Sequence, residues 1–532
     1  MNERSNVESG RQHILIASLQ DQGLYDHPIS GFQLHETHIS WVIRTGEYAY
    51  KIKKPVDFGF LDYSSLEKRR QYCLEELRLN RRFAPELYLE VVPITGTPEQ
   101  PMLYGEGEAI EFAVKMREFR QSALLNRMAG AGSLTTSHID GMIHTVAGFH
   151  DDTDAAGPGM PYGLPEDVHH WVTENFEHIH SRLPGEESPE DLDRVEEWTV
   201  SEYSRRSEQI RLRKDRGFVR ECHGDLHLGN MVLINEQVTL FDCIEFNANL
   251  RWIDVMSEVA FVVMDLDDRG YPQFAWRFLN GYLQHTGDYG GLSVLSYYLV
   301  YRALVRAKVA ILSLGQVSSG DSVRYRQIID EYRGYTGLAR TYTSRSRPSI
   351  LIMHGVSGSG KSSCAARLAE ELGAIRIRSD VERKRLHGYA ADANSQSGIK
   401  SGIYTEDAGR RTYERLAEMA ACIVDGGFIA IVDATFLEQV WRSRFQRLAA
   451  EHNAAFLILD MQAPVEVLRE RVRSRQSLRS DASEAGESVL GMQLRSQQSL
   501  TEEEMPDVLS VDTRIAWDIP GLMAAIRARL SV

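Results

Sequence analysis

A glycine-rich loop late in the chain constrains the fold more than any other feature. Residues 355–362 read GVSGSGKS and fit the pattern Gly-x-x-x-x-Gly-Lys-Ser. The stretch Ser349–His354 before it is mostly apolar, and Cys364, Leu368 and Leu372 recur at four-residue spacing after it. The pattern therefore predicts a strand, a phosphate-binding loop and a helix.

The chemistry of this loop indicates ATP with Mg²⁺. Glycines let backbone N–H groups turn toward phosphate oxygens, and the positive end of the following helix attracts the same charge. We expect Lys361 to reach the terminal phosphates and the Ser362 hydroxyl to coordinate Mg²⁺. The expected nucleotide-binding residues are Gly355, Ser357, Gly358, Ser359, Gly360, Lys361, Ser362 and Ser363.

Two further segments near the loop carry polar candidates. Asp433 ends the apolar run FIAIVD and is expected to help hold Mg²⁺; an aspartate that only caps the next helix is the alternative. In SDVER, Asp380 and Arg383 are three residues apart, so both would face one side of a short helix that begins at Ser379.

An arginine series follows in VEVLRERVRSRQSLR. Arg471, Arg475 and Arg479 are four residues apart and would share one face of a helix, while Val465, Leu468 and Val472 line another. Arginines in this arrangement suit a lid that closes over a transferred phosphate, with Arg471 and Arg475 acting in catalysis. A solvated helix face is the alternative.

Residues 348–512 resemble the P-loop kinase family that includes polynucleotide 5′-kinases, zeta-type toxins and small-metabolite kinases such as gluconate kinase. In that family an S-D-x-x-R segment places the aspartate on the acceptor hydroxyl as a base and the arginine on a substrate anion. The resemblance therefore implies these roles for Asp380 and Arg383.

A second kinase-type pattern lies in the first part of the chain. In ECHGDLHLGN, His223-x-Asp225-Leu226 is followed at the kinase spacing by Asn230, and a strand, a turn at residues 235–236 and a second strand then lead to Asp242. We expect Asp225 to accept the proton of an attacking hydroxyl, and Asn230 and Asp242 to bind Mg²⁺. His223 is expected to brace the loop.

A kinase of this kind also needs a lysine on a strand and a glutamate on a helix. In EYAYKIKKP, Ala49, Lys51 and Lys53 alternate onto one face, and Lys51 matches the A-x-K spacing, with Lys53 in reserve. The helical stretch after Asp62 offers Glu75 or Glu76 as the partner; a pair of solvated glutamates is the alternative. The run FAVKMREF is expected to lead into a hinge that contacts adenine.

From residue 33 to about residue 340 the chain resembles the aminoglycoside phosphotransferase-like branch of the protein-kinase-like fold. His-Gly-Asp stands for His-Arg-Asp, Asp-Cys-Ile stands where protein kinases have Asp-Phe-Gly, and no Ala-Pro-Glu segment follows. One departure is that no glycine-rich loop covers the phosphates: HETHISWV takes its place, and Thr37, Ser40 and backbone groups would make those contacts.

The tandem order of the two patterns resembles bifunctional aminoglycoside phosphotransferase/ATP-binding proteins. It implies an α+β protein-kinase-like domain followed by an α/β P-loop kinase domain with a parallel sheet, over residues 1–340 and 349–532 with a linker at 341–348. We therefore expect an ATP-dependent kinase with two Mg²⁺·ATP sites that phosphorylates hydroxyl groups of small molecules, with a sugar or aminosugar as a candidate for the first domain.

Two alternatives remain open. One domain alone is catalytic and the other senses nucleotide, or the C-terminal domain is a polynucleotide or nucleotide-sugar kinase of the zeta-toxin or polynucleotide-kinase type. A nucleic-acid partner is not favoured, because residues before Pro348 hold 37 Lys and Arg against 50 Asp and Glu, whereas the rest hold 23 against 25.

Composition narrows the class further. The 532 residues, 43% hydrophobic and 25% charged, are typical of a globular protein of two or three domains. The apolar runs are too short for a membrane span and no leader pattern opens the chain, so a cytoplasmic location is expected. The five cysteines are scattered and form no C-x-x-C pair, which favours reduced thiols over disulfides or a zinc site.

Overall fold

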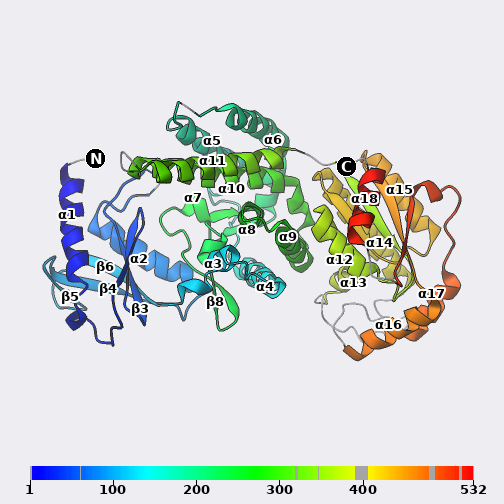
Figure 1. Ribbon diagram of the computed structural model, residues 1–532, viewed down its shortest axis with the longest axis horizontal. Coiled ribbons are helices and arrows are strands. Elements are labelled where there is room, and N and C mark those ends of the chain that lie inside the picture. The colour runs from blue at the N-terminus through cyan, green and yellow to red at the C-terminus, as the bar shows by residue number, and fades with distance from the viewer. Residues whose placement is uncertain are drawn as a thin grey trace. The chain divides into compact units, whose positions relative to one another are not determined.

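A computed structural model describes residues 3–59, 61–185, 187–317, 321–344, 347–389, 405–478, 486–514 and 518–530 (Figure 1). The chain forms two compact units. One unit combines Met1–Val168 with Leu212–Asp265, and the other combines His169–Arg211 with Leu266–Val532.

The first unit begins with an antiparallel sheet of six strands in the order β1-β2-β3-β6-β4-β5. Its strands are β1 (Gln33–Glu36), β2 (Ser40–Arg44), β3 (Tyr48–Lys53), β4 (Tyr88–Thr97), β5 (Gln100–Leu103) and β6 (Glu111–Arg117). Because side chains alternate along a strand, each face of this sheet carries its own apolar cluster.

Helices cover the two faces of this sheet differently. Leu15 and Ile16 of α1 (Glu3–Ser18) pack with Tyr50 and Ile52 of β3 on one face. On the other face Cys73 of α2 (Leu66–Asn80) packs with β4 and β6. The alternate β3 residues Ala49, Lys51 and Lys53 therefore face α2, as the alternation in the sequence predicts.

The rest of the first unit carries the kinase-type loop. Strand β7 (Val219–Glu221) pairs with β10 (Trp252–Asp254), and β8 (Met231–Ile234) pairs with β9 (Gln237–Leu240) in a hairpin. Asn235 and Glu236 form its turn with φ of 49° and 62°, which confirms the turn predicted there. The helices are α3 (Leu125–Gly130), α4 (Thr136–Asp152), α7 (Ala248–Arg251) and α8 (Val255–Asp268), which continues into the second unit.

The second unit contains a helical part and a parallel sheet. The helices are α5 (Pro165–His180) and α6 (Glu190–Asp215), which both begin or end in the first unit, and α9 (Pro272–Thr286), α10 (Leu292–Ser313) and α11 (Ser322–Thr343). Helix α11 ends just before β11 (Ser349–His354), so the connection between them falls in the predicted linker. The two compact units do not coincide with the predicted domains, residues 1–340 and 349–532. The predicted domain boundaries stay a prediction.

The parallel sheet has five strands in the order β12-β13-β11-β14-β15. After β11 these strands are β12 (Ile375–Arg378), β13 (Ile429–Asp433), β14 (Ala455–Gln462) and β15 (Val508–Asp512). The helices are α12 (Lys361–Leu372), α13 (Ser379–Leu386), α14 (Glu406–Asp425), α15 (Gln439–Glu451), α16 (Val465–Leu478), α17 (Glu487–Ser496) and α18 (Ile519–Leu530). An α/β P-loop domain thus follows an α+β kinase-like region, which confirms the predicted fold class.

Helix α9 is attached to the edge of the parallel sheet within the second unit. The Asn280 side chain donates from Nδ2 to the Ala374 carbonyl at 2.9 Å and accepts from the Arg376 N–H at 2.7 Å. Asn280 thereby satisfies one backbone group just before the edge strand β12 and one within it, at the edge where a further strand would otherwise pair. Arg277 of the same helix forms an ion pair with Glu370 of α12 at 3.1 Å.

Candidate active sites

The two lysines of β3 face helix α2 and share one carboxylate. Lys51 Nζ donates to Glu76 Oε1 at 2.8 Å, and Lys53 Nζ donates to Glu76 Oε2 at 2.6 Å. The Glu76 side chain is fully buried. Lys51 also contacts the carboxylate of Asp242, and Lys53 contacts that of Glu245. The structure therefore brings both candidate lysines to one site.

Glu75 is not part of this cluster. Its carboxylate accepts hydrogen bonds from Arg78 Nη2 and Arg251 Nη2, each at 2.8 Å. Successive helix residues point about 100° apart, so only one of the two glutamates can face β3. Of the two candidates, Glu76 and not Glu75 pairs with the lysines, and its role in nucleotide binding stays a prediction.

The charges of this cluster stabilise one another. Burial alone would lower the pKa of Lys51, but the Asp242 and Glu76 carboxylates outweigh it and raise that pKa well above its ordinary value. Burial would raise the pKa of Glu76, but Lys51 and Lys53 lower it to about 2. The lysines and Glu76 are therefore charged at neutral pH.

The loop around Asp225 is held by hydrogen bonds to His223. The His223 Nδ1 accepts from the Asp225 backbone N–H at 3.3 Å, so the proton is on Nε2, which donates to the Phe241 carbonyl at 2.8 Å. Burial also lowers the pKa of His223, which keeps the ring neutral. These two hydrogen bonds link the loop to the Phe241 carbonyl, as expected for a residue that braces the loop.

Asn230 lies beside Asp225 and is oriented by it. Its Nδ2 donates to the Asp225 carbonyl at 2.8 Å and to Asp225 Oδ2 at 3.1 Å. With the nitrogen engaged there, the amide oxygen is the atom left to bind a cation. The Asp225 carboxylate is about one-third exposed, which suits a group that must meet a substrate.

Asp242 adopts a left-handed backbone conformation with φ of 64°, which is uncommon for a residue other than glycine. Its backbone N–H donates to the Tyr88 hydroxyl at 2.9 Å, and the next N–H, of Cys243, donates to Asn80 Oδ1 at 3.0 Å. These bonds hold the strained backbone in place. The carboxylate is 44% exposed and contacts Lys51, so it is accessible to a cation.

In the turn of HETHISWV, the hydroxyls of Thr37 and Ser40 lie 2.9 Å apart and bond to each other. Thr37 Oγ1 also accepts from the Ser40 N–H at 2.9 Å. These bonds close the turn between β1 and β2. Phosphate contacts of this turn stay a prediction.

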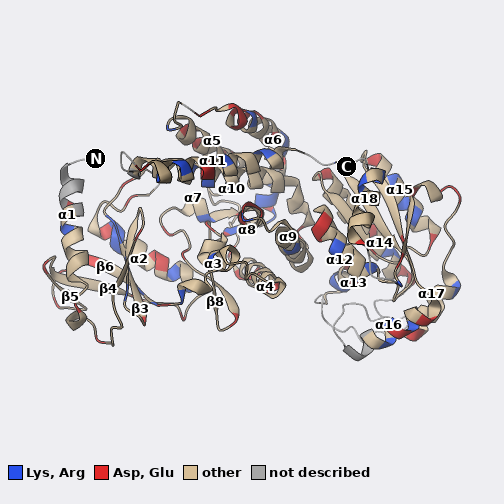
Figure 2. Cartoon of the chain, in the orientation of Figure 1, with Lys and Arg blue, Asp and Glu red and all other residues tan. Residues whose placement is uncertain are grey.

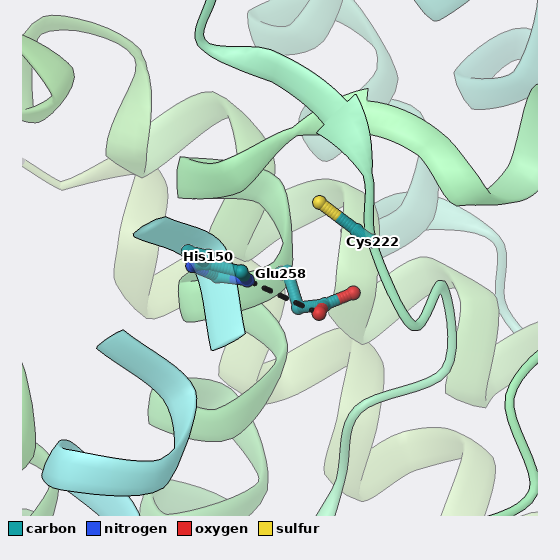
Figure 3. Close-up of side chains that lie close together, drawn as sticks. All are labelled: His150, Cys222 and Glu258. Atoms are coloured by element: carbon teal, nitrogen blue, oxygen red, sulfur yellow. Dashed lines mark hydrogen bonds and ion pairs between the residues drawn. The ribbon is translucent and has the colours of Figure 1, made fainter. Parts of the chain in front are cut away.

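A buried glutamate of α8, Glu258, accepts hydrogen bonds from the backbone of the kinase-type loop. Glu258 Oε1 accepts from the His223 N–H at 3.0 Å, and Oε2 accepts from the Gly224 N–H at 2.7 Å. His150 Nε2 lies 3.2 Å from the same Oε1 (Figure 3). Cys222 lies beside this group. Because backbone donors engage both carboxylate oxygens, Glu258 braces the loop.

Gly224 explains the His-Gly-Asp form of the loop. Its φ is 90°, and a Cβ at this position would lie 2.7 Å from the Leu250 carbonyl oxygen. A side chain would meet backbone there, so glycine is needed for the loop to reach Glu258. Sequence reasoning missed Glu258 because 35 residues separate it from His223.

We expect Glu258→Gln to destabilise the protein by about 2–3 kcal/mol at pH 7, because an amide cannot accept both N–H bonds. Burial would raise the pKa of Glu258, but bonds from His150 and Gly224 lower it to about 2. Its stabilisation is therefore present above the unfolded pKa of about 4.3 and is lost as the pH falls toward about 2. Urea unfolding should show a weaker acid dependence in this variant over that window. An unchanged acid dependence would contradict the role, and exposed Asp268→Asn is the control.

A matched pair of lysine variants should separate stability from nucleotide binding. Lys53→Met leaves the buried carboxylate of Glu245 without its cation and is expected to lower the free energy of unfolding by about 3–5 kcal/mol. Lys51→Met should lower it less, because Glu76 keeps Lys53 and Asp242 is accessible to water. Only Lys51→Met should abolish ATP binding at this site. Equal stability losses in urea unfolding would contradict the assignment.

The P-loop joins β11 to α12, as predicted. Gly355 and Gly358 have φ of 134° and 84°. An added Cβ would lie 2.9 Å from the Met461 carbonyl oxygen at Gly355 and 2.8 Å from the Leu468 carbonyl oxygen at Gly358. Both positions therefore require glycine, because neighbouring backbone fills the space.

The candidate Mg²⁺ ligands of the P-loop lie together. Ser362 Oγ donates to Asp433 Oδ1 at 3.2 Å, and Arg376 Nη2 donates to Asp433 Oδ2 at 2.5 Å. Burial would raise the pKa of Asp433, but Arg376 lowers it below its ordinary value. Lys361 Nζ donates to the Val356 carbonyl at 2.8 Å, which holds the ammonium inside the loop. Sequence reasoning missed Arg376.

Asp380 and Arg383 lie on the same side of α13, as expected, with Arg383 Nη1 3.3 Å from Asp380 Oδ1.

Arg471 donates from Nη1 to the Gly358 carbonyl at 3.3 Å and from Nη2 to the Thr513 carbonyl at 2.6 Å. It thus touches the P-loop, on a helix that also carries acidic residues (Figure 2). The side chain of Arg475 and the whole of Arg479 lie outside the described residues. The catalytic roles of these residues stay predictions.

Together these features define a protein-kinase-like domain followed by a P-loop kinase-type domain, which is the tandem order predicted from the sequence. Residues 350–500 match the family described as AAA domain. The chain is 28% identical over 463 residues to the uncharacterized proteins Rv2004c of Mycobacterium tuberculosis and Mb2027c of Mycobacterium bovis. These alignments cover 86% of this chain and 89% of each relative.

Solved structures resemble each part separately. A gluconokinase from Sinorhizobium meliloti is 23% identical, with a TM-score of 0.25, and the match covers 35% of this chain and 92% of that one. The GDP complex of aminoglycoside 2′-phosphotransferase IIIa is 12% identical, with a TM-score of 0.39, and covers 61% of this chain and 99% of that one. Within the described ranges, no helix is both long and apolar enough to cross a lipid bilayer.

Proposed function

We propose that the chain is an ATP-dependent phosphotransferase with two separate Mg²⁺·ATP sites, each transferring the terminal phosphoryl group to a hydroxyl of a small molecule. The observation that carries the proposal is the placement of Lys51 between the carboxylates of Glu76 and Asp242. A buried lysine held in this way can turn from Asp242 to the ATP phosphates when a cation takes over that carboxylate.

At the first site, different residues have different roles in binding and transfer. Asp225 accepts the proton of the acceptor hydroxyl, because its carboxylate is about one-third exposed and lies beside Asn230. Lys51 binds the phosphates while Glu76, held by Lys53 as well, keeps it in position. The oxygens of Asn230 and Asp242 are the hard donors that Mg²⁺ prefers.

At the second site the P-loop amides and Lys361 bind the phosphates. Ser362 and Asp433, 3.2 Å apart, offer two oxygen ligands of the kind that Mg²⁺ takes. When bound at either site, Mg²⁺ would offset the phosphate charge that develops during transfer. Asp380 is the candidate base for the acceptor hydroxyl, and Arg383 lies beside it to bind an acceptor anion.

A product screen tests this proposal. The full chain is incubated with labelled ATP and fractionated small metabolites, in parallel with Asp225→Asn and Lys361→Ala. We expect labelled products in the wild type, some lost only in Asp225→Asn and others lost only in Lys361→Ala. If one variant loses every product and the other loses none, a single domain is catalytic and the other senses nucleotide. If nucleic-acid ends are the labelled product, the C-terminal site is a polynucleotide kinase.

A further inference from the structure

Helices α16 and α17 pack against each other (Figure 1). Both also pack against the P-loop. The side chain of Val356, the second residue of the loop, lies in an apolar cluster with Leu468, Val472 and Leu490 from these helices. Val356 is 5% exposed. The loop is therefore buried at Val356 against the two helices.

One peptide group of the loop is held from both sides. Its carbonyl, of Val356, accepts from Lys361 Nζ at 2.8 Å, and its N–H, of Ser357, donates to Gln493 Oε1 of α17 at 2.8 Å. In a trans peptide the C=O and N–H point in opposite directions. Gln493 and Lys361 thus lie at opposite edges of the same peptide group and fix its orientation together.

We infer that Gln493 is a positioning residue for Lys361, a role that rests on the proposed function of the P-loop site. By engaging the Ser357 N–H, Gln493 keeps the Val356 carbonyl aimed at the Lys361 ammonium. Without it, the peptide plane can rotate, and the carbonyl that holds the ammonium inside the loop is lost. Preorganisation of this kind lowers the loss of freedom when ATP binds.

Arg471 supports the same segment from α16. Its Nη1 donates to the Gly358 carbonyl at 3.3 Å, so the peptide group before Ser357 and the one after Gly358 are each bonded to one of the two helices. This arrangement distinguishes Gln493 from a residue that only packs α17, because its bond is made to loop backbone and not to another helix.

Three substitutions of the full chain test the inference, each in an Asp242→Asn background that silences the first site. Gln493→Leu removes the acceptor and is expected to weaken ATP and ADP binding about three- to tenfold. Gln493→Glu keeps an oxygen for the Ser357 N–H and should bind both nucleotides nearly as the background does. Ser496→Ala is the control, because among the described residues its hydroxyl bonds to carbonyls of its own helix alone.

Nucleotide affinity by calorimetry and the melting temperature decide between the outcomes. Weaker binding in Gln493→Leu with rescue in Gln493→Glu supports positioning through the peptide. Loss of ATP affinity mainly in Gln493→Glu would instead mean direct contact with phosphate, and a lower melting temperature with unchanged affinity would mean packing alone; either result overturns the inference. If the Asp242→Asn background binds no ATP, the proposed second site itself fails.

Discussion

Asp225→Asn is expected to lower phosphoryl transfer at the first site by about two orders of magnitude or more while leaving Mg²⁺·ATP binding unchanged. The substitution keeps the size of the side chain and an oxygen for the Asn230 amide but removes the base. The exposed carboxylate that contacts Lys51 is that of Asp242, so we expect nucleotide binding to depend on the charge of Asp242 rather than on that of Asp225.

The test uses the full chain in a Lys361→Ala background, so that only the first site reports. Asp242→Asn is the matched variant, because it changes a carboxylate to the same amide at a residue that contacts Lys51. It should weaken nucleotide binding only when Mg²⁺ is present. Equal loss of ATP affinity in the two variants would show that Asp225 holds nucleotide and is not the base.

Lys361→Ala is expected to weaken ATP binding at the second site by roughly a hundredfold or more. The buried ammonium is the cation that the loop itself presents to the phosphates, and its backbone amides alone leave that charge uncompensated. Lys361→Met, which keeps the volume of the side chain, should have the same effect, so a packing defect cannot explain the loss.

The measurement is ATP affinity of the full chain in the Asp242→Asn background. The full chain is required because Asn280 and Arg277 of α9 bond to the edge of the parallel sheet and to α12. A fragment that begins at residue 348 would leave those groups unpaired. Affinity retained within a few-fold would overturn the assignment of this loop.

Local patterns in the sequence were sufficient to predict those parts of the fold and of the candidate sites in which the residues lie close together along the chain. The strand, loop and helix around Lys361 were predicted because the glycines and the apolar repeat are contiguous. Asp225, Asn230 and Asp242 were predicted because one loop and one hairpin carry all three. The alternation of β3 correctly placed Lys51 and Lys53 on one face.

The parts that were missed depend on residues far apart in the chain. Glu258 reaches the loop from a helix 35 residues later, and Arg376 reaches Asp433 from the neighbouring strand. Neither pair of residues is close enough in the sequence to form a recognisable motif. Choosing between Glu75 and Glu76 requires knowing how α2 is rotated about its own axis. The packing of Cys73 against the sheet sets that rotation.

The central claim, two separate nucleotide sites in one chain, is tested most directly by the stoichiometry of Mg²⁺·ATP binding to the full-length protein. Calorimetry should give two ATP molecules per wild-type chain, one for Asp242→Asn, one for Lys361→Ala and none for the double variant. Circular dichroism of each variant confirms that the fold is retained. A wild-type stoichiometry of one, abolished by either single substitution, would contradict the account.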